Sequence, residues 1–540
     1  MSLAPADLRR GEWVYLMDLT IGSVVHRFAE LPVEGVPFGP LSASVDYVGG
    51  LDVGGGVGRE IDLFEDVPSS RSLNATLDVT ARMDVPAMVF AGHTFLGADV
   101  RVYLHPVGST SREAVFAGTV TAFEFQTKDD PVSLTASADI GEDVGTVHGS
   151  NDKLSAMAAV IDEEQRSTWL PVVFGAPGNG SASATPELHA YGAPAFGVVA
   201  ATIYQVAICP QMTAAGVAAD NVFFWNKTKD YSGLIACSME TTLRGDTATF
   251  ATVAAFGPPE WETGDEIWID WAASSGGILH PDGSTIRGAG DVLYWMASRA
   301  QGVVVDLPRI ASIAPTLNRF KVDAAVWGAD GEHVGPLAWV NEYLLPMLPV
   351  SAVMGPGGLY YSVWDPDATA HDAVATLDTG AGGNAYRMSD VESSDLSDIA
   401  NDIVVRYGFD AKSGKPTKER RIVGDPSVII YSGTNTRRGL WASRSAHRFG
   451  GRPGKAVDLP AVWDDATADM AASWLERRWS LPTYAVSYEC PPSMAFLRPG
   501  DVVTVTDRGL ALSGRVALVT VATPERSGSV KVRVRIYEGG

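Results

Sequence analysis

The clearest pattern of apolar and polar positions lies near the C-terminus, between residues 463 and 538. It begins with apolar side chains that recur at steps of four, three and four and so share one face of a helix: Ala468, Ala472, Leu475 and Trp479. Asp464 and Asp465 stand where the N-terminus of this helix favours carboxylates. Pro482 ends the helix, because proline has no N–H to donate and restricts the residue before it.

Strand-like segments follow this helix, at residues 483–490, 497–507, 514–524 and 529–538. The last segment alternates apolar with basic side chains and predicts a strand with one face in water. The alternating residues are Val530, Val532, Val534 and Ile536 on one face and Lys531, Arg533 and Arg535 on the other. Pro499-Gly500 supplies the turn before the valine-rich strand within the second segment. We therefore expect the helix to pack on a small antiparallel barrel or sandwich.

Strands also dominate the start of the chain. Residues 11–34 predict a hairpin that turns at Ile21-Gly22-Ser23, with His26 as a surface or cross-strand residue of its second strand. Further strands at close spacing are predicted at residues 72–83, 98–107, 114–126 and 132–140. Such spacing is typical of an all-β sandwich or barrel. We assign residues 1–145 to this first domain.

A second group of strands occupies the middle of the chain. A linker helix is predicted at residues 152–167, and a glycine- and serine-rich loop at 175–183. Short strands separated by turn residues come next, at residues 197–208, 221–226, 233–240, 246–256 and 265–271. We assign residues 146–289 to the linker helix and a β domain inserted between the two halves of the chain.

Helices become clear after this insertion. Three-four spacing predicts one helix at residues 290–302 and another at 336–349, and a hairpin follows at 354–367. These elements indicate a small α/β module at residues 290–394, and the last β domain takes residues 395–540. Within that last domain, two polar, turn-rich segments are predicted as loops, at residues 408–421 and 432–439.

Composition limits the classes of protein. A chain of 540 residues with 46% apolar and 19% charged side chains is an ordinary globular chain of three or four domains. The three cysteines, Cys209, Cys237 and Cys490, form no CxxC pair and indicate neither a disulfide framework nor a zinc site. We find no apolar run of signal-peptide or membrane-span length, and we expect neither export by a classical signal nor membrane insertion.

The net charge of −23 comes from 41 basic and 64 acidic residues. Such a surface repels duplex DNA, so we expect no specific binding of nucleic acid. Plain solubility accounts for this charge. A wall that does not hold DNA would also suit a conduit through which DNA passes.

Candidate chemistry is sparse. The glycines Gly54, Gly55, Gly56 and Gly58 lack the spacing of a phosphate-binding loop and indicate a loop or bulge. A cation could meet the cluster Asp365, Asp367, His371 and Asp372, but its spacing differs from the EF-hand loop and favours a turn with a helix cap. Motifs of metalloproteases, serine hydrolases and nucleotide-binding loops are absent from the sequence. We therefore predict no catalytic, cofactor-binding or metal-binding residue and no cofactor.

Two further groups of residues have a structural and a functional interpretation. The carboxylates Asp390, Glu392, Asp395, Asp398 and Asp402 are expected on a solvated face, with the last three on one side if the segment is helical. An acid pair for glycoside hydrolysis stays open, because its members are distant in sequence. The tryptophans Trp225, Trp261, Trp268 and Trp271 either line a sugar-binding face or belong to a core.

Several segments resemble the tail-tip hub protein of long-tailed, siphovirus-like bacteriophages. The resemblance is carried by LERRW at residues 475–479, TYAVSYEC at 483–490, LRPGDVVTVTD at 497–507, DIANDIVVRYGFD at 398–410, GEWVYLMDLTIGSVVHRFAE at 11–30 and LPVVFGAPG at 170–178. It implies a mainly β, multidomain hub in which the first and last domains are tube-like β-barrels joined by the small α/β module.

The same resemblance implies a function. The chain would form a homotrimeric ring in the virion, at the tail tip, after assembly in the cytoplasm of the host bacterium. Its partners would be the distal tail protein ring above, the tape-measure protein in the lumen, and a central fibre or receptor-binding proteins below. The terminal domains would sit side by side around a DNA channel with an acidic wall.

Two other classes of protein stay open at the level of sequence. A polysaccharide-degrading enzyme with β accessory domains would show a cleft with two carboxylates roughly 5–10 Å apart. A carbohydrate-binding adhesin would show an exposed row of tryptophans.

Overall fold

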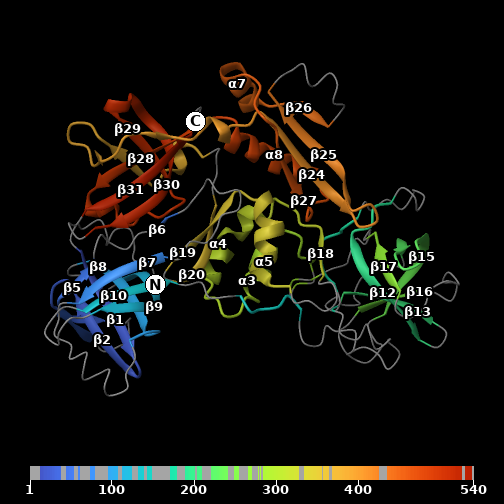
Figure 1. The fold of residues 1–540 in the computed structure, drawn as a ribbon, viewed down its shortest axis with the longest axis horizontal. Coiled ribbons are helices and arrows are strands. Elements are labelled where there is room, and N and C mark those ends of the chain that lie inside the picture. The colour runs from blue at the N-terminus through green and yellow to red at the C-terminus, as the bar shows by residue number, and fades with distance from the viewer. Residues whose placement is uncertain are drawn as a thin grey trace.

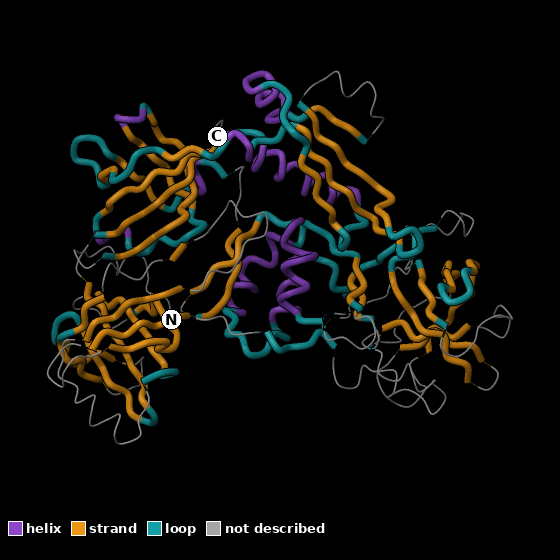
Figure 2. Tube along the Cα trace, viewed as in Figure 1, coloured by secondary structure: helices purple, strands orange, loops and turns teal. Residues whose placement is uncertain are grey.

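The computed structural model describes residues 13–37, 44–53, 59–60, 73–79, 95–106, 112–124, 132–138, 143–148, 169, 171–178, 189–200, 203–209, 220–240, 249–253, 265–270, 278, 280, 282, 284–327, 334–355, 357–363, 368–424, 435–525 and 529–537. Strands form several separate sheets around a central group of helices (Figure 1, Figure 2). The predicted fold class, mainly β and multidomain, is confirmed. The domain boundaries stay predictions.

The N-terminal sheet has nine strands in the order β3-β4-β2-β1-β8-β9-β10-β7-β5. They are β1 (Trp13–Ile21), β2 (Val24–Ala29), β3 (Val33–Pro37), β4 (Ser44–Gly49), β5 (Leu51–Val53), β7 (Leu73–Val79), β8 (Asp99–Pro106), β9 (Glu113–Glu124) and β10 (Val132–Ala138). The predicted hairpin is confirmed, since Ile21 pairs with Val24 across Gly22, whose φ of +61° suits glycine. His26 lies opposite Leu19, as a cross-strand residue.

The insertion barrel is a closed, six-stranded barrel in the order β12-β13-β16-β15-β14-β17. Its strands are β12 (Ala193–Ala200), β13 (Ile203–Cys209), β14 (Asp220–Asn226), β15 (Tyr231–Glu240), β16 (Thr249–Val253) and β17 (Glu266–Ile269). The single strand predicted at residues 197–208 is wrong, because the chain reverses between β12 and β13. The predicted linker helix at residues 152–167 lies outside the described residues.

The centre of the molecule is helical (Figure 2). Its helices are α3 (Ala289–Ala297), α4 (Leu307–Leu317) and α5 (Pro336–Trp339). Helix α5 continues as the π-helix η5 (Val340–Leu344) and the 3₁₀ helix η6 (Leu345–Met347). Two strand pairs lie with them, the hairpin β19 (Val350–Gly355) and β20 (Gly358–Val363), and β11 (Val172–Phe174) with β18 (Ala324–Val326). Helices α3 and α4 pack closely at Gly290, where an added Cβ would lie 2.2 Å from the carbonyl oxygen of Ala314.

Helix α4 is absent from our sequence predictions. Its two prolines suggest a break, but Pro308 stands in the first turn, where the missing N–H costs nothing. Asp306 caps this turn by accepting a hydrogen bond from the backbone N–H of Arg309. Pro315 lies in the last turn, and Leu317 ends the helix two residues later.

The C-terminal sheet has eight strands. Its path is β21-β29-β30-β31-β28-β22, with β23 also on β28 and β6 also on β30. The strands are β6 (Arg59–Glu60), β21 (Ala375–Asp378), β22 (Tyr386–Arg387), β23 (Glu392–Ser393), β28 (Thr483–Cys490), β29 (Val502–Asp507), β30 (Leu512–Pro524) and β31 (Val530–Tyr537). All four segments predicted after residue 482 are strands of this sheet.

A separate α8 unit precedes these strands. It consists of a four-stranded sheet in the order β26-β25-β24-β27, with α7 (Leu440–Phe449) and α8 (Asp465–Trp479) beside it. The strands are β24 (Asp402–Asp410), β25 (Lys415–Val423), β26 (Thr436–Arg438) and β27 (Lys455–Leu459).

The predicted packing of α8 is wrong. The helix contacts β24 and β25, and its apolar face shares a core with Ile403 and Val405. The strands β28–β31 bury their apolar side chains in a different cluster, around Val486 and Val534. Arg535 also departs from the predicted wet face: it is 6% exposed, because Trp479 and Tyr537 lie around it.

The first and last parts of the chain lie side by side (Figure 1). The short strand β6, from the N-terminal half, pairs with Val521 and Ala522 of β30. The buried hydroxyl of Tyr15 donates to the carbonyl oxygen of Pro524 over 2.6 Å, and Arg498 forms an ion pair with Glu113. The N-terminal sheet and the C-terminal sheet are thus joined directly. Within the described residues, no helix is long and apolar enough to cross a membrane.

Candidate functional site

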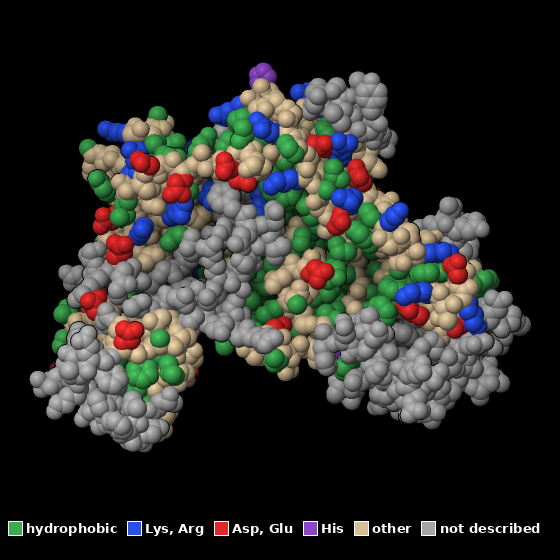
Figure 3. Space-filling view, in the orientation of Figure 1, with side chains coloured by type: hydrophobic (Ala, Val, Ile, Leu, Met, Phe, Trp, Pro, Cys, Tyr) green, Lys and Arg blue, Asp and Glu red, His purple; other side chains and the backbone are tan. Residues whose placement is uncertain are grey.

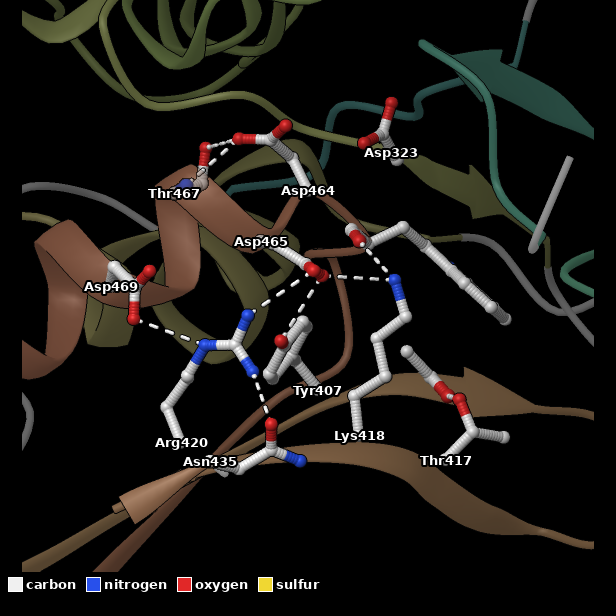
Figure 4. Close-up of polar contacts among 12 residues, drawn as sticks. Asp323, Tyr407, Thr417, Lys418, Arg420, Asn435, Asp464, Asp465, Thr467 and Asp469 are labelled. Atoms are coloured by element: carbon white, nitrogen blue, oxygen red, sulfur yellow. Dashed lines mark hydrogen bonds and ion pairs between the residues drawn. The ribbon is translucent and has the colours of Figure 1, made fainter. Parts of the chain in front are cut away.

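The N-terminus of α8 is the centre of a polar network between that helix and the sheet beneath it (Figure 4). Asp464 is the N-cap residue, and its carboxylate accepts hydrogen bonds from the backbone N–H and the hydroxyl of Thr467, both at 2.8 Å. The sequence pattern predicts carboxylates at the N-terminus of this helix, and that position of Asp464 and Asp465 is confirmed. The cap fixes where the helix starts.

Asp465 connects α8 to the side chains of strands β24 and β25. Its carboxylate accepts from the Tyr407 hydroxyl at 3.1 Å and from the Lys418 ammonium at 3.0 Å, and it lies 3.1 Å from the Arg420 guanidinium. Burial opposes ionisation of Asp465, but Lys418, then Tyr407 and Arg420, outweigh it and hold the pKa of the carboxyl below its ordinary value. Arg420 also donates to Asp469 one turn further along α8.

This network corrects the loop prediction for residues 408–421. Lys418 and Arg420 belong to strand β25, whose polar side chains meet the carboxylates of α8 instead of solvent alone. Strand β26 likewise occupies part of the predicted loop at residues 432–439. A strand whose partners are charged residues of a distant helix shows no apolar alternation in sequence.

Helix α7 is held by a buried carboxylate of α8. Glu476 is 6% exposed and accepts hydrogen bonds from the backbone N–H groups of Trp441 and Ala442 at 2.8 and 3.0 Å. These N–H groups belong to the first turn of α7, which has no side-chain cap of its own. The carboxylate of α8 therefore caps α7 and fixes its position.

A cleft of about 540 Å³ opens where the insertion barrel, the central helices and the α8 unit meet. Half-buried aromatic rings line it: Trp268, Trp327, Tyr343 and Phe409. Its charged lining residues among those described are the acids Asp323, Glu342 and Asp410. Burial, and then the nearby Glu342, raises the pKa of the Tyr343 hydroxyl. The cleft is aromatic and acidic.

The insertion barrel joins the rest of the molecule through a neck, the residues that directly flank its first and last strands, 189–192 and 270. His189, before β12, lies with its Nδ1 atom 2.5 Å from the Asp270 carboxylate, just after β17, and both side chains are buried. The backbone N–H of Tyr191 donates to Asp410 at 2.8 Å, which ties the neck to the end of β24. Lys412, in the following turn, donates to Ser232 of the barrel.

The predicted cluster around His371 is described in part. Asp365 and Asp367 lie outside the described residues. His371 and Asp372 belong to the exposed 3₁₀ helix η7 (Ala370–Asp372). Asp372 accepts from the backbone N–H and the hydroxyl of Thr369, both at 2.8 Å, and these bonds lower the pKa of its carboxyl. The geometry of Asp372 is that of a helix cap.

The carboxylates between residues 390 and 402 are not on one helix. Asp395 and Asp398 form a capping box on the 3₁₀ helix η8 (Leu396–Asp398), and Asp402 starts β24, where it forms a bidentate pair with Arg421. Glu392 forms an ion pair with Arg533 of β31. No helix spans these carboxylates, because the chain enters strand β24 at Asp402. The expected solvated face is found for the other four, which are all exposed.

The other residues singled out from the sequence, which are the tryptophans, the glycines and Cys490, do not come together in one site among the described residues. Trp225 is buried against Tyr191 and Phe223, and Trp268 lines the cleft, whereas Trp261 and Trp271 are outside the described residues. Glycines 54, 55, 56 and 58 are also outside them. Burial raises the pKa of the Cys490 thiol to about 12. Across the described part of the chain, no group of three His, Cys, Asp or Glu side chains is arranged to hold a metal ion.

Comparison with known proteins finds a matching family model, over part of the chain. Residues 436–519 match the family model described as "Putative phage tail protein". The matched stretch runs from β26 through α7 and α8 into β30. It contains the α8 side of the network, Asp464 to Asp469, and the cap of α7, whereas Tyr407, Lys418 and Arg420 precede it. The match supports a structural role in a bacteriophage tail. No curated protein matches the chain.

Similar solved structures include the tail protein from Neisseria meningitidis MC58, at 10% identity and a TM-score of 0.38, with 97% of each chain covered. The 43 kDa tail protein of prophage MuSo2 from Shewanella oneidensis has 9% identity and a TM-score of 0.34, with 97% of this chain and 98% of that chain covered. Prophage tail protein gp18 from Listeria monocytogenes EGD-e has 9% identity and a TM-score of 0.22, with 64% and 89% covered. Likenesses at these TM-scores add no weight to the family match.

Proposed function

We propose that this chain is the structural hub of a siphovirus-like tail tip. Three copies form a ring that joins the tail tube above to the central fibre and receptor-binding proteins below. The observation that carries the proposal is the family match at residues 436–519, together with the direct pairing of β6 with β30. That pairing brings two large, mostly antiparallel sheets from opposite ends of one chain side by side.

The arrangement suits a junction between different symmetries. A ring of three chains with two large β domains each presents six such domains, which is the number required by a hexameric ring of distal tail proteins. Closed rings of identical subunits also avoid open-ended growth. The buried Tyr15–Pro524 hydrogen bond and the Arg498–Glu113 ion pair hold the two sheets at one distance within each chain.

The partners of the hub follow from its place in the tail. The distal tail protein ring lies above it, the tape-measure protein occupies the lumen, and fibre or receptor-binding proteins attach below. DNA passes through the channel without being bound, because the chain carries 64 acidic against 41 basic residues. The role is structural and involves no catalysis.

One observation favours a second candidate function, carbohydrate binding by an adhesin. The cleft beside the insertion barrel combines four half-buried aromatic rings with carboxylates, a combination that suits the apolar faces and hydroxyls of a sugar. Titration with cell-wall oligosaccharides of the host, followed by tryptophan fluorescence, would test it. Saturable binding that Trp268→Ala removes would support the adhesin.

The hub proposal is tested on virions. Phage grown with an amber mutation in this gene should produce free heads and tails that fail to mature, and wild-type virions should bind gold-labelled antibody at the tail tip. Label along the tail shaft or on the head, or infectious particles without the protein, would contradict the proposal.

A further inference from the structure

Two surfaces of this chain have opposite charge in a protein whose overall charge is strongly negative. Residues 436–455 contain six Arg or Lys and no Asp or Glu, whereas residues 389–402 contain five Asp or Glu and no Arg or Lys. The first stretch forms β26, α7 and the loop to β27, and the second runs from β22 to the start of β24. Charge segregation of this kind calls for a partner of the opposite sign.

The basic face is the exposed side of β26 and α7. It consists of Arg437, Arg438, Leu440, Trp441, Arg444 and Arg448. Within α7, positions 440, 444 and 448 are spaced by four and share one side of the helix, while Ala442 and Ser445 are buried on the other. Lys and Arg side chains gather at the apex that α7 forms (Figure 3).

Two arginines of this face, Arg438 and Arg444, contact neutral groups. The guanidinium carbon of Arg444 lies 4.6 Å from the ring centre of Trp441, and that of Arg477 lies 4.0 Å from the same ring. Arg438 donates to the hydroxyl of Ser443. Leu440 is 61% exposed beside them. Exposed arginine and leucine beside a half-buried tryptophan, on a helix fixed by the Glu476 cap, are typical of a preformed protein-binding surface.

The acidic segment comprises residues 386–398. Its carboxylates at 390, 392, 395 and 398 are exposed, Glu392 in its ion pair with Arg533, and large apolar side chains stand before and between them. Of the sixteen exposed large apolar side chains among the described residues, four fall in this segment: Tyr386, Met388, Val391 and Leu396. Tyr386 is 72% exposed. An apolar strip of this kind with acidic borders matches the basic face in both charge and apolar character.

These two surfaces lie on different parts of the chain. The strands β22 and β23 of the acidic segment pair with β28, whereas α7 packs on α8 and β25. In Figure 1, β28 lies within the C-terminal sheet and α7 forms the apex of the α8 unit. Complementary patches at two separate places on one chain are what a head-to-tail contact between copies requires, and such contacts form a ring when the rotation from one copy to the next closes.

We propose that the basic face of one copy docks on the acidic segment of the next copy and so forms the contact that closes the ring. This proposal rests on the proposed hub function and names its subunit interface. Nucleic acid is the other anionic partner that a basic face could take. The exposed Leu440 and the apolar strip on the acidic segment favour a protein partner.

Charge exchange between the two surfaces tests the proposal by sedimentation velocity. Arg444→Glu with Arg448→Glu reverses the basic face, and Asp390→Arg with Asp395→Arg reverses the acidic segment. Either pair alone should weaken association by about 100-fold, since like charges then oppose each other. All four substitutions in one chain should restore association to within about tenfold of wild type.

A second measurement tests the proposal even if the fourfold variant folds poorly. An equimolar mixture of the two reversed variants should associate, because each supplies the surface that its partner needs, although neither associates alone. Arg319→Glu with Lys415→Glu is the matched control, because both side chains are exposed elsewhere and the change in net charge equals that of the first pair. This control should associate as wild type does.

Four results would overturn the proposal. The first is a wild-type oligomer that is unchanged by either reversal, which would leave the ring itself standing on another interface. The second is a mixture that associates no better than its components. The third is a wild-type chain that stays monomeric at its highest soluble concentration in low salt. The tail-tip position of the protein is tested separately, by the gold-labelled antibody. The fourth is binding of a duplex DNA oligonucleotide that Arg444→Glu with Arg448→Glu abolishes, without any change in the oligomer.

Discussion

The α8 unit and the insertion barrel are both β-rich units that adjoin the same central helices, yet they are attached very differently. The α8 unit shares one continuous apolar core with the central helices. Buried polar groups reinforce this core: the Trp474 indole N–H donates to the carbonyl oxygen of Met347, and the Thr467 hydroxyl accepts from the backbone N–H of Lys321.

Among the described residues, the insertion barrel meets the rest of the molecule through a small number of contacts, while the His189–Asp270 pair holds the two ends of the barrel together. These contacts are the hydrogen bond from Tyr191 to Asp410, the small apolar cluster that includes Ala411, the edge-on contact of Trp268 with Trp327, and the hydrogen bond from Lys412 to Ser232. A unit that shares a core unfolds with its neighbours, whereas a unit with few attachments opens separately. We therefore expect one unfolding transition for the α8 unit with the central helices and a separate one for the barrel.

The largest effect is expected in the α8 unit, from Trp474→Ala. Removing this buried ring should lower the free energy of unfolding by about 3–5 kcal/mol and shift the main transition in a urea titration. Trp474→Phe keeps most of the ring volume and should cost clearly less. A main transition that stays in place with Trp474→Ala would show that the α8 unit and the central helices do not share a core.

His189→Ala should act on the barrel alone. The substitution leaves the Asp270 carboxylate buried without its imidazole, at an expected cost of about 1–3 kcal/mol. Limited proteolysis and hydrogen exchange should show faster opening of residues 193–269, with no change in the main transition. Equal loss of protection in α8 would contradict the separation of the two units.

The contribution of Asp465 to the free energy of unfolding should depend on pH. Its pKa is lowered in the folded state, so its stabilising contribution is present above the ordinary pKa of about 3.9 and is lost as the pH falls through the lower folded value. Because Asp465 is exposed, the contribution should be about 0.2–1 kcal/mol. Unfolding of wild type and Asp465→Asn should differ near neutral pH and converge in acid. A difference that does not change with pH would argue against the ion pairs.

The smallest effect is expected from Lys412→Ala at the barrel contact. Its exposed bond to Ser232 and its ion pair with Asp230 should contribute at most about 0.5 kcal/mol. Lys415→Ala, on the same hairpin, serves as the control. A loss above about 1 kcal/mol in either unfolding transition would mean that this contact contributes more to the attachment than an exposed ion pair does.

Sequence reasoning succeeds here where one face of an element is apolar and the other is polar. Strand β31 and helix α8 have that pattern, and both were predictable within a few residues. Helix α7 was not, because its buried positions are the small Ala442 and Ser445 while its long side chains face outward. Strand β25 was missed because its polar side chains pair with α8.

The candidate site was harder to predict for a related reason. Tyr407, Lys418 and Asp465 come from three elements, and their meeting depends on α8 packing against β24 and β25. The predicted packing of α8 on the following strands places these residues apart. The N-cap Asp464 was predictable because a cap acts within four residues of its own helix.

Cryo-electron microscopy of the assembled ring, or of the tail tip in situ, tests the central claim most directly. The account predicts three copies of the chain around one axis, with N-terminal and C-terminal sheets alternating in a six-part layer and α7 of each copy against residues 386–398 of the next. A ring with another number of copies, or an axial layer built from one kind of sheet alone, would contradict it.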